Sequence, residues 1–392
     1  MLSAGFRILL AYLIFYASLG AVFPFLPVFY RDIGLALDQI GLLLAVQAAI
    51  QLVFGPVWGG LADQFPRSRA ALPLSAAIAT VGAIALYLSL GFTAVLVTSL
   101  VLYAGLAGVT PLLDARTMET LGPAARHQFG QVRAFGSLAF VIGTLAVGVM
   151  LDAYGPRSLF WAYIPLLLLT IMVTATIPRR GFTRSVSLRR GAGEIFSIPG
   201  VPLLLVGFVV LWTALAGANA FYSIQLVSLG GGASLVGLAW AIGAMVEVPI
   251  MYSFPRLAGR FGAERLLVVG GLSFALRAGL AAFANDPAML VAIAPLEGIG
   301  FAGTFVGGVT VLAARAPAGT GGTAQGLLSG SAGLATILGS TVAGVIAVAI
   351  GIPGLFVICA VVSLAGSAIV ALAIVRPVRP VRPVQRSVSP AD

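Results

Sequence analysis

Charged residues, cysteine and histidine are scarce in this chain, and lysine is absent. Only 9% of the 392 residues are charged and 60% are hydrophobic, whereas a soluble protein carries about 25% charged residues. A single cysteine, Cys359, and a single histidine exclude a disulfide and a metal site built from these residue types. An intramembrane enzyme would need a nucleophile–base pair or a metal cluster. We find neither in the sequence, and we expect no catalytic site, metal or bound cofactor.

The apolar residues that fill the chain predict a polytopic membrane protein. A membrane-spanning helix needs about 20 mostly apolar residues, and twelve such segments follow one another. The first, residues 6–30, is too long for a signal-peptide core, so we expect it to be retained. A basic, glycine-rich stretch at 179–199 separates six segments from six. We therefore predict an all-α membrane protein with helical bundles at 1–178 and 200–376, followed by a disordered basic tail at 377–392.

The positions of the basic residues predict the orientation. Most of the 22 arginines lie in loops on the side of the N-terminus, the central stretch and the C-terminal tail. The positive-inside rule then places both termini in the cytoplasm. The net charge of +10 is a matter of topology, and we expect no nucleic-acid partner. A weak internal repeat relates residues 59–67 to 255–262, and two similar halves are typical of secondary transporters.

Asp114 and Arg133 bring charges of both signs into two adjacent apolar segments. A short turn at Gly122-Pro123 would place them at similar depth and allow them to face each other. An ionisable group at such depth costs roughly 2.5–3.5 kcal/mol and marks a functional site by default. The alternative is an ion pair that only fixes the hairpin.

The loop after the second segment resembles the signature of the major facilitator superfamily. Gly59, Asp63, Arg67 and Arg69 match the pattern G-x-x-x-D-R/K-x-G-R-R/K-R/K, and Arg260 belongs to a second copy that has lost the acid. The resemblance implies twelve helices in two pseudo-symmetric bundles around a central cavity. It also implies that these residues form a gating latch at the cytoplasmic face.

A closer resemblance is to the branch that contains lactose, nucleoside and phenylpropionate permeases. The stretches that carry it are 20–27, 111–115 and 129–136. In lactose permease the acid and the arginine at the positions of Asp114 and Arg133 bind the sugar. Phe140 stands where lactose permease has its sugar-stacking tryptophan, which argues against a galactoside.

The C-terminal half places Glu247, Arg277 and Glu297 in apolar segments. Glu247 and Arg277 are similar to a pair in the phenylpropionate-permease branch, whereas Gly300 stands where lactose permease carries its proton-exchanging glutamate. We expect Glu297 or Glu247 to exchange a proton while Arg277 modulates it. A static structural triad is the alternative.

Several polar residues in helices are weaker candidates for substrate contacts. Gln47 belongs to the second segment, and Asn219, Tyr222 and Gln225 recur at i, i+3 and i+6 in the seventh. Such side chains also form hydrogen bonds between membrane helices, and this alternative stays open.

The sequence therefore predicts a transporter of a small organic solute, such as a sugar, a nucleoside or an aromatic acid. We expect proton-coupled symport by alternating access, a monomer, and a location in the bacterial inner membrane. An exporter of the same superfamily is the main alternative, although the arginine and proline motifs of drug antiporters are absent from the fourth and fifth segments. A non-transporting solute sensor is another.

Overall fold

The computed structural model describes residues 3–65, 70–125, 129–178, 193–317 and 320–375, and within these ranges it contains helices and no strand. The helices are α1 (Ala4–Val22), α2 (Leu26–Asp32), α3 (Leu37–Gln64), α4 (Ala71–Leu88), α5 (Phe92–Ala125), α6 (Phe129–Tyr154), η2 (Pro156–Ser158), α7 (Leu159–Thr176), α9 (Val201–Ser228), α10 (Ala233–Phe261), α11 (Ala263–Ala282), α12 (Pro287–Ile293), α13 (Pro295–Arg315) and α14 (Gly321–Val375). The tail at 377–392 and most of the 179–199 stretch lie outside the described residues.

The described chain contains eleven stretches that are long and apolar enough to cross a membrane. The last of them, Gly321–Ile374, has 54 residues, about twice the length that one span requires. It is interrupted at Gly351, where φ is +77°, a backbone conformation that glycine adopts without steric cost. Counted as two spans, α14 completes the twelve that the sequence predicts, and the chain is a multi-pass membrane protein.

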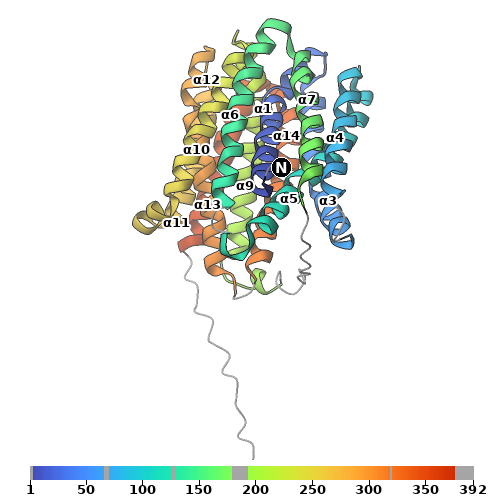
Figure 1. Ribbon diagram of the computed structural model, residues 1–392. Coiled ribbons are helices and arrows are strands. Elements are labelled where there is room, and N and C mark those ends of the chain that lie inside the picture. The colour runs from blue at the N-terminus through green and yellow to red at the C-terminus, as the bar shows by residue number, and fades with distance from the viewer. Residues whose placement is uncertain (1–2, 66–69, 126–128, 179–192, 318–319, 376–392) are drawn as a thin grey trace, which may run out of the picture.

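The helices run side by side in one bundle (Figure 1). α3 and α4 lie at one edge, α10 and α12 lie at the other, and α1, α6, α9 and α14 lie between them. Two extensive contacts join helices before the 179–199 stretch to helices after it, namely α3 with α14 and α6 with α10. α7 ends and α9 begins at the same end of the bundle, which we call the linker end. We call the opposite end the far end.

At the far end α3 and α14 are packed backbone to backbone. A Cβ atom placed on Gly41 would lie 2.5 Å from the Ser340 carbonyl oxygen and 2.9 Å from the Gly344 Cα. No side chain fits into this space, and small residues at helix contacts are how membrane helices approach closely.

The second contact at the far end is polar. The Asp152 carboxylate of α6 accepts hydrogen bonds from the backbone N–H groups of Ala233, at 2.5 Å, and Ser234, at 3.0 Å. These groups open α10, so an acid from one half of the chain caps a helix of the other half. A carboxylate is stabilised there by the free N–H groups and by the helix dipole.

Glycines of the same helices toward the linker end lie in open space. A Cβ atom placed on Gly59 of α3, Gly259 of α10 or Gly330 of α14 would meet no described atom within 4 Å. Among the described residues, the close backbone contacts between the halves therefore lie toward the far end.

One local expectation was wrong. The sequence predicts a turn at Gly122-Pro123, but α5 continues through both residues to Ala125. Hydropathy locates the apolar span and not the end of the helix, and α5 extends past that span through Arg116 and Glu119. Both are residues that are compatible with a helix.

Substituting Gly344 with alanine tests the far-end contact. The new methyl group would lie 2.9 Å from the Asp38 Cα and from the Leu37 carbonyl oxygen, and overpacking of this kind costs about 1–3 kcal/mol. We expect a lower unfolding temperature for Gly344→Ala in detergent.

Gly330→Ala is the matched control on the same helix. It meets no described atom within 4 Å, and alanine stabilises a helix interior by roughly 0.5–1 kcal/mol relative to glycine. We expect an unchanged or higher unfolding temperature. Equal shifts for the two variants would contradict the packing described above.

Candidate functional site

Asp114 of α5 and Arg133 of α6 meet inside the bundle. The Arg133 Nη1 lies 3.3 Å from the Asp114 Oδ2, a long contact for a charged pair. The Arg133 and Asp114 side chains are 46% and 30% exposed, respectively. Two ionisable groups therefore lie within membrane-spanning helices and yet remain accessible from a space that is not filled by protein.

Two tyrosines of α1 complete this first cluster, and the sequence analysis missed both. The Tyr12 hydroxyl donates a hydrogen bond of 2.5 Å to the Asp114 Oδ1. The Tyr16 ring lies below the Arg133 guanidinium, with 5.7 Å between the ring centroid and Cζ. Their spacing of four residues places both on one face of a helix, and this spacing is the signal that the sequence offers. We refer to Tyr12, Tyr16, Asp114 and Arg133 as the N-half cluster.

A second cluster joins three helices of the other half. The Arg277 Nη1 of α11 lies 2.7 Å from the Glu297 Oε2 of α13 and donates a 2.8 Å hydrogen bond to the Asn219 Oδ1 of α9. Asn219 in turn donates to the Glu297 Oε1 at 3.0 Å. The Arg277 Cζ also lies 4.0 Å from the centroid of the Tyr222 ring, a cation–π contact. We refer to Asn219, Tyr222, Arg277 and Glu297 as the C-half cluster.

The two clusters differ in their access to solvent. The Arg277 and Glu297 side chains are only 6% and 15% exposed, and Arg277 is engaged on several sides. Tyr222 is buried, and its hydroxyl donates to the Leu290 carbonyl oxygen, which fixes the ring below Arg277. The C-half cluster is thus a closed network, whereas the N-half cluster leaves its cation open.

Glu247 of α10 lies beside the C-half cluster, because its backbone nitrogen packs against Gly298, the residue after Glu297. No hydrogen bond or ion pair joins its carboxylate to another of the described residues. The Glu247 side chain is thus half-buried and without a fixed partner among these residues.

The structure does not bring every predicted residue into these clusters. Phe140 lies where the backbone of α6 packs against Gly20 of α1, and the described ring contacts do not include its side chain. Gln225 is buried one turn beyond Tyr222 on α9. Gln47 is half-buried on α3.

The predicted latch falls mostly outside the described structure. Arg67 and Arg69 lie outside the described residues, and so does the side chain of Asp63. Gly59 lies on the open part of α3. The Arg260 guanidinium lies over the ring of its neighbour Phe261, 5.2 Å from the centroid.

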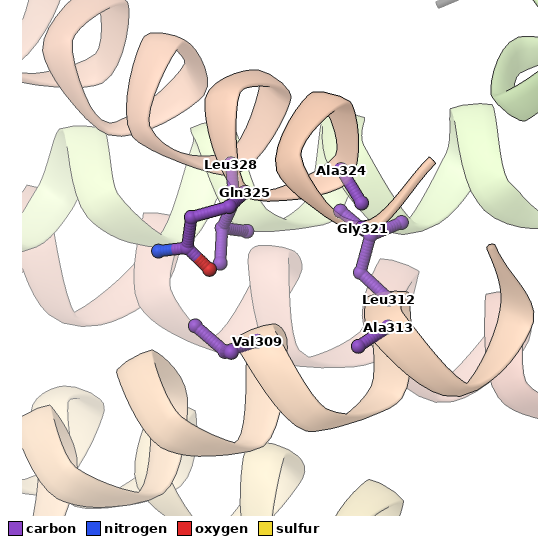
Figure 2. Close-up of a pocket in the computed structure, with 7 residues that line it drawn as sticks. All are labelled: Val309, Leu312, Ala313, Gly321, Ala324, Gln325 and Leu328. Carbon is purple, nitrogen blue, oxygen red and sulfur yellow. The ribbon is translucent and has the colours of Figure 1, made fainter. Parts of the chain in front are cut away.

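A separate small pocket lies between α13 and α14 at the linker end (Figure 2). Its empty volume, which includes open solvent, is about 170 Å³. Gln325 is its one amide side chain, and the rest of the lining is apolar or small. Leu312 of this lining lies ~22 Å along α13 from Glu297 at 1.5 Å per residue, so the pocket is distinct from both clusters.

The chain is similar in sequence to known membrane transporters. The maltose permease of Geobacillus stearothermophilus is 28% identical over 281 residues, which are 71% of this chain and 70% of that protein. The probable 3-phenylpropionic acid transporter of Escherichia coli is 25% identical over 276 residues, 69% of this chain and 72% of that protein.

Solved structures share the fold. The crystal structure of the nucleoside transporter NupG superposes with a TM-score of 0.85 at 14% identity, covering 96% of this chain and all of that one. The model of the MFS_1 like family matches residues 6–357. The chain therefore belongs to the MFS_1 like family and is a transporter of the major facilitator superfamily.

Proposed function

We propose that this transporter is a proton-coupled symporter that takes up a small organic solute by alternating access. The observation that carries the proposal is the division of the charges within the membrane-spanning helices into two clusters, one open and one closed, with Glu247 beside the closed one. The open N-half cluster receives the substrate. The C-half cluster and Glu247 provide the proton coupling.

The proposed role of the N-half cluster in substrate binding rests on the free hydrogen-bond donors of Arg133. A guanidinium has five N–H donors in a planar fork, and among the described residues only Asp114 accepts from it. The remaining donors suit a carboxylate or a pair of hydroxyl groups. Each Asp114 oxygen can accept a second hydrogen bond in addition to those from Tyr12 and Arg133.

The proposed site of proton exchange rests on a difference between Glu297 and Glu247. Both Glu297 oxygens face fixed partners, Asn219 and Arg277. Glu247 has no such partner among the described residues. We therefore assign proton exchange to Glu247, and we assign to Glu297 the role of holding Arg277 in place.

The contacts between the halves support alternating access. We place both termini in the cytoplasm of a bacterial cell and the chain, as a monomer, in the inner membrane. The linker end then faces the cytoplasm. We interpret the close backbone contacts at the far end, together with the open space beside Gly59, Gly259 and Gly330, as an inward-facing state. Opening the far end requires Asp152 to leave the α10 N-terminus.

The named relatives suggest the compounds to test. They are a maltose permease, a probable 3-phenylpropionic acid transporter and a nucleoside transporter. Maltose, 3-phenylpropionate and uridine therefore form a first panel of probes. Uptake and efflux in proteoliposomes, measured with each compound, also separate import from export.

Removing either charge of the N-half pair should strongly weaken substrate binding. Asp114→Asn and Arg133→Ala each delete one member of the pair, and a lost hydrogen bond to a charged group costs about 1.5–3 kcal/mol, or roughly 10- to 100-fold in affinity. Isothermal titration of the purified variants with the panel measures this loss. Arg157→Ala is the control, because Arg157 contacts only Tyr87 in the described structure. Normal binding by both cluster variants would remove the site assignment.

Neutralising Glu247 should separate exchange from accumulation. Glu247→Gln keeps the size of the side chain but cannot carry a proton. We expect substrate exchange across proteoliposomes at the wild-type rate and no accumulation driven by a proton gradient. Accumulation at the wild-type level would show that the proton binds elsewhere, and the same experiment on Glu297→Gln tests the other acid.

A further inference from the structure

The N-half cluster contains two aromatic residues that the charged pair by itself does not explain. Tyr12 is 0% exposed although it carries a hydroxyl group in a membrane-spanning helix. Its O–H donates to the Asp114 Oδ1, and the Thr117 hydroxyl lies 3.4 Å from its oxygen. The phenol therefore fixes one oxygen of the acid, while the other oxygen faces Arg133.

Tyr16 contacts the Arg133 guanidinium, as Tyr12 contacts the Asp114 carboxylate. Its ring faces the Arg133 guanidinium, and it stacks on Tyr12 at 5.7 Å with an angle of 9° between the planes. An offset stack of this kind is favourable and resists sliding of either ring. Because the rings support each other, the positions of the acid and the cation are linked through α1.

Gly136 allows this arrangement from the side of α6. A Cβ atom at this position would lie 2.9 Å from Cδ2 and 3.0 Å from Cγ of Tyr16. The Tyr16 ring therefore packs directly on the backbone of α6, in space that a side chain larger than that of glycine would take. Gly136 and Arg133 are three residues apart on one face of α6, and Tyr16 is thus held against the turn that carries the guanidinium.

We propose that Tyr12 and Tyr16 are positioning residues of the substrate site. Tyr12 orients the Asp114 carboxylate through its hydroxyl, and Tyr16 orients the Arg133 guanidinium through its ring face. The roles rest on the proposed function, but the two contacts can be tested without a substrate. The two contacts use different parts of a tyrosine. The contact of Tyr12 needs its hydroxyl group, and the contact of Tyr16 needs its ring.

Double-mutant cycles on thermal unfolding test the contacts in the purified full chain. We expect Tyr12→Phe and Asp114→Ala to be non-additive, and Tyr16→Leu and Arg133→Ala likewise, because each pair shares one interaction. Tyr16→Phe with Arg133→Ala is the matched control and should be additive. Additive behaviour of both contact pairs would overturn the proposal whatever the transporter carries.

Transport kinetics with maltose, 3-phenylpropionate and uridine test the role. We expect Tyr12→Phe to raise the half-saturation concentration about 10-fold, the effect of one hydrogen bond to a charged group, and Tyr16→Leu to raise it about 3- to 10-fold. Tyr16→Phe keeps the ring and should therefore raise the half-saturation concentration less than Tyr16→Leu does, and maximal rates should be unchanged.

Other outcomes of the transport and stability measurements would count against one of the two proposals. Equal, small effects of Tyr12→Phe and Tyr16→Phe would indicate ordinary packing and overturn the proposal. A large effect of Tyr16→Phe would indicate that its hydroxyl binds the substrate directly, which also overturns it. Non-additive stability cycles in a chain that transports none of the three compounds would leave the contacts established and count against the proposed function alone.

Discussion

A charge inside a membrane must be paired or hydrogen-bonded, and this constraint organises the interior of the protein. Arg277 satisfies it almost completely, because an acid, an amide and an aromatic ring surround it. Arg133 satisfies it with one long contact and the face of a tyrosine. Desolvation makes an unpaired ion costly, so an incompletely paired arginine persists only where solvent or a ligand reaches it. The exposed side chain of Arg133 meets that condition.

The two halves are joined by contacts that can be broken. Close backbone packing at Gly41 and Gly344 and the capping of α10 by Asp152 hold the far end together. Both contacts depend on short distances that a small rotation of one half would remove. A transporter that exposes its site to each side in turn needs contacts that such a rotation can break.

Much of this could be predicted from the sequence. The twelve spans follow from hydropathy, and the Asp114–Arg133 contact follows from charge within apolar segments. The sequence also singled out Asn219, Tyr222, Arg277 and Glu297, although it could not show that they form one network, because they come from three helices whose rotation depends on packing.

The remainder depends on tertiary structure. Tyr12 and Tyr16 are common residues in an apolar helix, and only the packing of α1 against α5 and α6 brings them to Asp114 and Arg133. The end of α5 was misjudged because hydropathy reports the apolar span and not the hydrogen-bonded helix. Glu247 was one of two candidate acids, and the partners of Glu297 supply the distinction between them.

The central claim is that substrate and proton bind to different halves of one transporter and cross the membrane together. Proteoliposomes loaded with a pH-sensitive dye, without an imposed gradient, measure this directly. The account predicts that adding a transported compound from the panel outside acidifies the interior, in step with uptake of the labelled compound. Uptake of the labelled compound without any change in internal pH would contradict it.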